Sequence, residues 1–182
     1  MGRLFLHTNV SLDGYIADAA GDIDWQFADD EFQGHIDELL DSIDGMVFGR
    51  KAYEALACYW PTAGDEVSAT QRRRMHELPK YVLSRTLRAT TWHNSHLVED
   101  ASELADLEGD IALFAGGEAA TSAARLGLLD EVRLVVNPVL LGGGTRLFDG
   151  EYAKTAFTLV DDRRFASGAL LLTYAAARHA ST

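Results

Sequence analysis

The chain has 182 residues, 47% of them hydrophobic and 24% charged, and its formal net charge is −12 from 16 basic and 28 acidic side chains. So much negative charge repels nucleic acid and anionic membrane surfaces, which argues against an extended polyanionic partner. Cys58 is the sole cysteine, so no internal disulfide can form. No apolar run approaches the length of a membrane span. We expect a cytoplasmic protein with one domain over residues 1–182.

Short apolar or alternating runs, each bounded by turn residues, predict the strands. They lie at 4–10, 45–48, 81–84, 111–115, 131–141, 156–165 and 170–177, with shorter candidates at 91–93 and 96–98. Apolar residues spaced three and four apart predict helices at 32–43, 51–58, 67–78, 102–107 and 118–126. Asp29 or Asp30 supplies the cap of the first helix, and Gly127 ends the last one.

The order of these elements predicts the fold class. Strands alternate with helices up to about residue 130, which indicates right-handed βαβ units and a mainly parallel sheet. The two final strands are joined by the polar segment 161–168 and read as an antiparallel hairpin. We therefore expect an α/β protein with a mixed sheet.

Three of the expected strands end in residues suited to holding phosphate, and the carboxyl ends of strands are where open α/β sheets bind ligands. These residues are Gly49, Arg50 and Lys51 after the second strand, Ser84, Arg85 and Thr86 after the third, and Gly116, Gly117, Glu118 and Ala119 after the fourth. Glycine N–H groups at a helix start can approach a phosphate closely. The alternatives are two solvated cations, a polar turn and a tight strand-to-helix turn. All three together in an acidic chain favour a local pocket for a phosphorylated cofactor.

The first strand ends in a second candidate site. Asn9 and Asp13 lie at this end, and Asp13-Gly14 also suits an ordinary turn. Trp25 is followed by Asp29 and Asp30, which present carboxylates beside an aromatic surface but are equally suited to capping a helix. Here the interpretation is a substrate site in which Asn9, Asp13 and Trp25 bind. The histidines lack metal-ligand spacing, so no metal is expected.

Five motifs resemble the dihydrofolate reductase superfamily, and more closely its branch named for the reductase domain of the bifunctional riboflavin-biosynthesis deaminase-reductase. They cover nearly the whole chain in the right order, at 11–17, 49–54, 83–86, 115–118 and 128–148. The resemblance implies a dihydrofolate reductase-like, three-layer fold with a sheet of about eight strands that binds NADPH across the strand ends. Arg50, Lys51, Ser84 and Arg85 would surround the 2′-phosphate, and the backbone of 116–119 would hold the pyrophosphate.

The same resemblance implies an activity and an assembly. The family activity is the reduction of 5-amino-6-(5-phosphoribosylamino)uracil, and relatives commonly form homodimers. This chain departs from the riboflavin-pathway pattern at 55–61, where the residues that serve the ribose phosphate are missing. We therefore expect an NADPH-dependent reductase of a small heterocyclic, carbonyl or imine substrate. The resemblance to dihydrofolate reductases, in which a carboxylate five residues after a tryptophan helps to protonate the substrate, leaves Asp13, Asp30 or water as the expected proton source. The alternatives are a dihydrofolate or pterin reductase-like enzyme, or a non-catalytic NADPH-binding sensor.

Overall fold

Eight strands form one mixed sheet in the computed structural model, which describes residues 2–177. Their order is β5-β4-β3-β6-β1-β7-β10-β9. The bounds are β1 Arg3–Ser11, β3 Gly45–Gly49, β4 Lys80–Leu83, β5 Ser95–Val98, β6 Asp110–Leu113, β7 Glu131–Asn137, β9 Phe157–Arg164 and β10 Leu170–Ala176. The six strands from β5 to β7 run parallel, and β10 is antiparallel to both β7 and β9.

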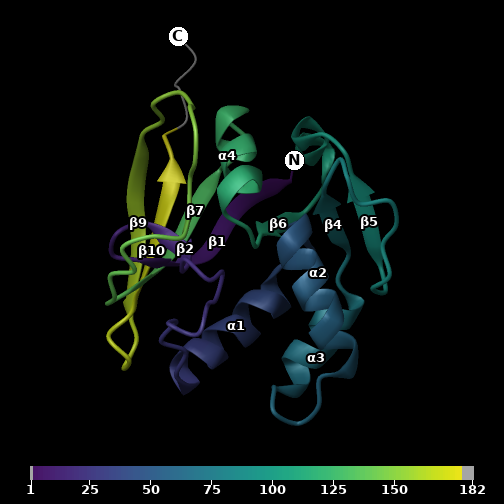
Figure 1. The fold of residues 1–182 in the computed structure, drawn as a ribbon, viewed down its shortest axis with the longest axis horizontal. Coiled ribbons are helices and arrows are strands. Elements are labelled where there is room, and N and C mark those ends of the chain that lie inside the picture. Colours follow the sequence, from purple (N-terminus) through teal and green to yellow (C-terminus); the bar gives the residue numbers. More distant parts are fainter. Residues whose placement is uncertain (1, 178–182) are drawn as a thin grey trace.

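Helices cover both faces of this sheet. They are α1 (Asp30–Ser42), α2 (Arg50–Tyr59), α3 (Ala69–Glu77) and α4 (Gly117–Arg125), with short 3-10 helices η1 (Trp60–Thr62) and η2 (Ala101–Asp106). In Figure 1, α4 lies on one side of β1 and α1 on the other. The alternation of side chains along β1 sends Leu4 and Leu6 into the core under α4 and Phe5 into the core under α1.

Local sequence explains where several elements begin and end. The Asp29 carboxylate accepts a hydrogen bond from the Phe32 backbone N–H at 2.8 Å and so caps α1. Pro79 follows the last turn of α3, and Gly127 ends α4 in the left-handed region at φ +67°. The fold class and the C-terminal hairpin are thus as the sequence predicts.

Four details differ from the sequence expectations. β7 ends at Asn137 rather than continuing to Leu141, because Pro138 has no N–H for the ladder. Residues 91–93 form no strand; the N–H groups of Thr91 and Trp92 donate instead to the Tyr53 hydroxyl, both at 3.0 Å. Residues 101–106 form a 3-10 helix. A small second sheet, not expected, pairs β2 (Tyr15–Ala17) with β8 (Thr145–Arg146).

Candidate functional site

The three phosphate-suited strand ends meet at one edge of the sheet. Arg50, the first residue of α2, donates from Nη1 to the Thr86 hydroxyl at 2.8 Å and pairs with Glu54 at 2.9 Å. Arg85 pairs with Glu118 at 3.8 Å, which connects the turn after β4 to the start of α4. Side chains from three separate segments therefore form one continuous surface. All four charged groups are exposed, so they can rearrange around a ligand.

The two glycines at the start of α4 exclude other residues for different reasons, Gly117 by its backbone conformation and Gly116 by the packing around it. Gly117 has φ +57°, and its N–H donates to the Leu147 carbonyl at 2.9 Å. A Cβ on Gly116 would lie 2.2 Å from Ile16 Cδ1, which is too close for any side chain. Packing against the 142–147 loop and β2 thus explains part of the need for glycine. Because neither glycine has a side chain, the backbone at this turn can be approached closely by a phosphate.

Ser84 organises the turn that carries the basic residues. Its buried Oγ accepts from the backbone N–H groups of Thr86 and Leu87, at 3.2 and 3.0 Å. Lys51 is exposed on the first turn of α2. Two cations at a helix start oppose the helix dipole, and a bound anion would relieve that conflict.

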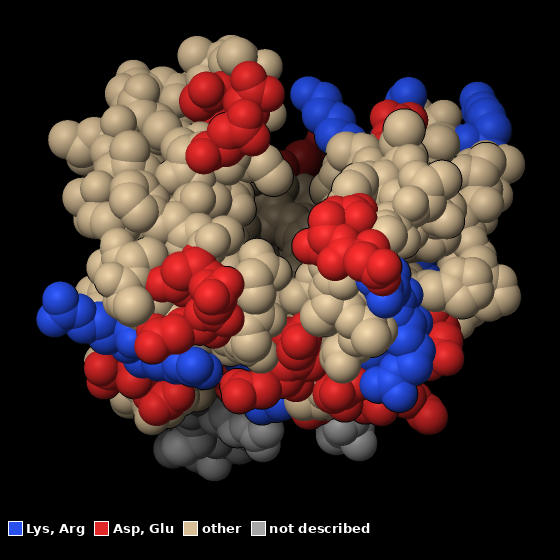
Figure 2. All heavy atoms as spheres, turned by 90° about the horizontal axis from the view of Figure 1, so that it is seen from below, with Lys and Arg blue, Asp and Glu red and all other residues tan. Residues whose placement is uncertain are grey.

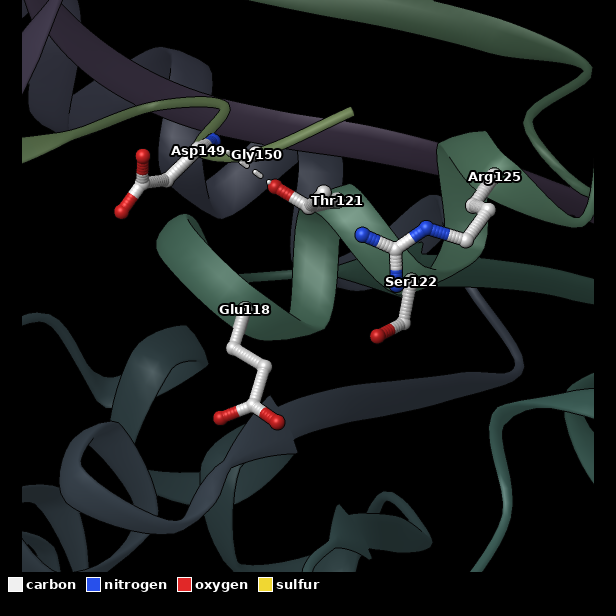
Figure 3. A pocket seen from close by; sticks show the side chains of 6 residues that line it. All are labelled: Glu118, Thr121, Ser122, Arg125, Asp149 and Gly150. Carbon is white, nitrogen blue, oxygen red and sulfur yellow. Dashed lines mark hydrogen bonds between the residues drawn. The ribbon is translucent and has the colours of Figure 1, made fainter. Parts of the chain in front are cut away.

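Two neighbouring hollows open along α4. One, of about 430 Å³, is lined by Tyr15, Gly117, Glu118, Gly144, Thr145, Arg146 and Asp149. Figure 3 shows the other, of about 310 Å³, where the Asp149 N–H donates to the Thr121 hydroxyl at 2.9 Å. Glu118 lines both hollows, and in Figure 3 its carboxylate points away from that hydrogen bond. The start of α4 is therefore open to solvent on the side of the β2–β8 sheet.

A depression lies in the middle of the face shown in Figure 2, with acidic side chains at its rim and basic side chains at several places farther out. Rings pack at the carboxyl ends of the central strands: Phe114 lies 5.7 Å from His7 and 6.0 Å from Phe48, between ring centroids. Phe114 is half-buried, whereas Phe48 is buried. An aromatic surface at this position suits a flat heterocycle.

Asp13 links the turn after β1 to the loop at 141–142 through hydrogen bonds. Its carboxylate accepts from the Ser11 hydroxyl at 2.7 Å and from the N–H groups of Leu141 and Gly142 at 3.1 and 2.7 Å. The Ser11 hydroxyl, followed by the Gly142 N–H, lowers the pKa of Asp13 to about 2. Asp13 is therefore ionised at neutral pH and is a poor proton donor.

The two carboxylates before α1 have different surroundings. Asp29 is the cap, and its second oxygen accepts from the Ser167 N–H at 2.7 Å; the Phe32 N–H is the main cause of its lowered pKa. Asp30 is exposed as the first residue of α1. Trp25 is half-buried and donates from its indole N–H to the Asp22 carbonyl at 3.1 Å. Asp30 is thus the more exposed of the two carboxylates and does not cap the helix.

Asn9 lies half-buried near the end of β1. Its side-chain oxygen accepts a hydrogen bond from Asn137 Nδ2 at 3.0 Å. The sequence analysis missed Asn137, together with Thr145 and Arg146 beside the α4 start. A signal for Asn137 existed, because a polar residue before a proline marks a strand end. The strand expected from the sequence extended past Pro138 to Leu141, so Asn137 was expected inside the strand and not at its end.

The described part of the chain contains no group of three or more His, Cys, Asp or Glu side chains arranged to hold a metal ion. Within residues 2–177, no helix is long and apolar enough to cross a membrane.

Comparison with known proteins identifies relatives over nearly the whole chain. Residues 3–171 match the family model for the RibD C-terminal domain. The uncharacterized protein YyaP of Bacillus subtilis is 33% identical over 178 residues, which is 94% of each chain. A second uncharacterized protein of that organism, YwjB, is 29% identical over 168 residues, covering 90% of this chain and 92% of its own.

Solved structures share the fold. A putative riboflavin biosynthesis protein from Shewanella superposes with a TM-score of 0.74 at 23% identity, covering 98% of this chain and 100% of its own. A pyrimidine reductase-like protein from Corynebacterium diphtheriae gives 0.70 at 12% identity, with 97% and 92% coverage. This chain thus belongs to the RibD C-terminal domain family and has the dihydrofolate reductase-like fold of that family.

Proposed function

We propose that the protein is an NADPH-dependent reductase of a small heterocyclic, carbonyl or imine compound. One observation carries the proposal: the basic and hydroxyl side chains after β3 and β4 meet the glycine turn before α4, through the Arg50–Thr86 and Arg85–Glu118 contacts. A dinucleotide that carries an extra phosphate has the right chemistry to join these three segments.

Each part of this surface fits one part of the cofactor. Arg50, Lys51 and Arg85 would hold the 2′-phosphate, with the Ser84 and Thr86 hydroxyls beside it. Backbone N–H groups of Glu118 and Ala119, at the start of α4, would face the pyrophosphate, with Gly116 and Gly117 giving it room to approach. The Gly117 N–H is already bonded to Leu147, so the later N–H groups are the ones available.

When bound, NADPH supplies a hydride. The contribution of the protein is to hold the substrate beside the nicotinamide, keep water out and deliver a proton. The half-buried ring of Phe114 would form the ring surface, and Asn9 and Trp25 would bind the substrate. Asp13 would shape the site by holding the 141–142 backbone. Asp30, or water held near it, would bring the proton.

A relative's name supports the proposed substrate class. A related chain from Thermotoga maritima, of which this chain covers 56%, is named as a deaminase and 5-amino-6-(5-phosphoribosylamino)uracil reductase, and it superposes with a TM-score of 0.65 at 16% identity. We propose a uracil-like heterocycle as the starting point for substrate searches.

The test is NADPH oxidation, followed at the absorbance of the reduced nicotinamide, against a panel of pyrimidines, pterins, aldehydes and imines. A reductase oxidises NADPH with at least one of them and stops doing so in the Asp30→Asn variant at high pH. Tight NADPH binding without oxidation by any member of the panel would instead indicate a sensor.

A homodimer is the assembly that we propose. β9 forms the outer edge of the sheet in Figure 1, and the Leu159 and Val160 side chains on it are 49% and 57% exposed. The first half of β9, residues 157–160, carries no charge, and a bare uncharged edge invites pairing with another strand. A twofold pairing of two β9 edges would cover it.

A further inference from the structure

Asn137 joins three separate segments at the end of β7. This residue is fully buried. Its side-chain Nδ2 donates to Asn9 Oδ1 on β1 and to the Val135 carbonyl, both at 3.0 Å. Its Oδ1 accepts from the Phe27 N–H, in the segment before α1, at 2.8 Å. Every polar atom of this buried amide is thus used.

The backbone partners fix which way the Asn137 amide points. The Phe27 N–H can only donate, so it must face the amide oxygen, and the Val135 carbonyl can only accept, so it must face the amide nitrogen. Because Asn137 then has a donor left for Asn9, the Asn9 side chain must offer its oxygen to Asn137. The Asn9 NH₂ group is consequently turned away from Asn137.

The free NH₂ group lies on the face of the sheet covered by α1. Side chains alternate along β1, so Asn9 shares a face with Phe5 and His7. His7 contacts His35 of α1 and the ring of Phe114. Asn9 is half-buried, and within residues 2–177 no protein group accepts a hydrogen bond from its Nδ2. The structure therefore places an oriented, unpaired donor on the same face of the sheet as these aromatic rings.

We infer that Asn9 donates to a carbonyl oxygen of the substrate ring and that Asn137 is the positioning residue that fixes this polarity; the inference rests on the proposed reductase function. A freely rotating amide could offer either its donor or its acceptor and would not distinguish a carbonyl from an amino group. The Asn137–Asn9 pair removes that freedom. The site thereby selects rings that carry exocyclic carbonyl groups over rings that carry amino groups.

The Asn137→Asp variant should invert this selectivity. The new carboxylate still accepts from the Phe27 N–H, but it has no donor for Asn9. The Asn9 amide would then turn over to give its NH₂ to residue 137 and would present its oxygen to the substrate. A purely structural role for Asn137 would predict lower stability with no change in ligand preference.

The experiment uses two probes of the same ring size: uracil, whose exocyclic groups are carbonyls, and 2,4-diaminopyrimidine, whose exocyclic groups are amines. Each is titrated into the ¹⁵N-labelled protein with and without NADPH, and the Asn9 side-chain NH₂ signals report the contact. We expect uracil to shift these signals downfield and to bind about tenfold more tightly than the diamine, as the loss of one buried hydrogen bond would give. In Asn137→Asp, this preference should disappear or reverse.

Two further variants complete the test. Asn9→Asp keeps the contact with Asn137 but lacks the donor, so it should lose about tenfold in uracil affinity even if Asn137→Asp does not fold. Gln71→Glu makes the same amide-to-carboxylate change at another buried position, on α3, and should leave the preference intact. Unshifted Asn9 signals with uracil, or full uracil affinity in Asn9→Asp, would overturn the inference. Failure to bind NADPH, measured separately, would count against the proposed function instead.

Discussion

Glu118 opposes the charge that the proposed cofactor needs. Its carboxylate is 90% exposed and pairs with Arg85 at 3.8 Å, so a bound 2′-phosphate would have to compete with it. Glu118→Gln keeps the backbone N–H that faces the pyrophosphate. We expect NADPH affinity to rise by about 0.5 kcal/mol, a factor of two to three, because an exposed ion pair contributes little.

Fluorescence titration of the Glu118→Gln variant at low and high salt checks this expectation. The gain should shrink at high salt, since exposed charges are then screened. Asp106→Asn, which removes an exposed carboxylate at the end of η2, is the control. An unchanged or weaker NADPH affinity in Glu118→Gln would show that Arg85 does not hold a phosphate.

At the scale of elements, the strand-to-helix turn between β6 and α4 has a positive-φ glycine, Gly117, at the point where the pyrophosphate is proposed to bind. Gly117→Asp places a carboxylate where the pyrophosphate would lie, in a backbone conformation at φ +57°. An added Cβ would have room, since its nearest neighbour is Thr145 Cγ2 at 3.6 Å. We therefore expect a folded variant without nucleotide affinity, because the new charge repels the phosphates.

Gly117→Ala separates the two effects. It introduces the same backbone strain, about 1 kcal/mol, without the charge, and should lower the melting temperature slightly while it retains most of the NADPH affinity. Calorimetry for stability and titration for affinity make the comparison. Equal affinities in the aspartate variant and the wild type would leave these glycines with a packing role alone.

The contact between β1 and α1 contains a pair of buried histidines. His7 Nε2 lies 3.1 Å from His35 Nε2, and burial, followed by the charge of His35, lowers the pKa of His7 from 6.5 to about 3. Burial also lowers the pKa of His35. Between about pH 6.5 and pH 3 the unfolded chain binds more protons than the folded one, so stability falls as the pH is lowered through this window. For His7 the loss is on the order of 3–5 kcal/mol over the whole window.

Urea unfolding between pH 4 and 7 measures this dependence. The His7→Leu/His35→Leu variant should show a smaller loss of unfolding free energy on acidification than the wild type, because its folded state no longer excludes those protons. The slopes are compared rather than the absolute stabilities, since the new packing changes the latter. Identical slopes in the two proteins would mean that these histidines do not govern acid stability.

At the scale of the whole molecule, the exposed β9 edge predicts a dimer. Light scattering at micromolar concentration should give about twice the monomer mass of 19.9 kDa. Val160→Lys should shift the mass toward the monomer, because a charge on an edge strand blocks pairing. Thr158→Lys adds the same charge at another position of β9, and its mass shows whether the loss of the dimer is specific to position 160. A wild-type protein that stays monomeric at these concentrations would contradict the proposed assembly.

Most of the architecture was predictable because hydrophobic periodicity reports burial directly. The run 111–115 is apolar at every position and its first three residues lie in the central strand β6, and most of the apolar run 170–177 forms the antiparallel β10. The Asp29 cap was among the stated alternatives. Sequence also located the three strand ends, since basic and glycine residues interrupt apolar runs there.

What the sequence did not show depends on contacts between distant residues. The amide pair of Asn9 and Asn137 joins positions 128 residues apart, and neither residue is distinctive by itself. The β2–β8 sheet is only two to three residues long on each side, too short for a periodic signal. His7 and His35 each resemble an isolated core residue until the fold brings them together.

The binding of NADPH and NADH tests the central claim most directly. The dissociation constants of both nucleotides are measured for the wild type, for Arg50→Ala/Arg85→Ala and for Arg73→Ala, an exposed arginine on α3 that pairs with Asp41. We predict that the wild type and Arg73→Ala prefer NADPH. In the double variant, the ratio of the NADH to the NADPH dissociation constant should fall by about tenfold for each lost charge-assisted contact, while its NADH affinity stays the same. Equal affinities of the wild type for the two nucleotides would contradict the account.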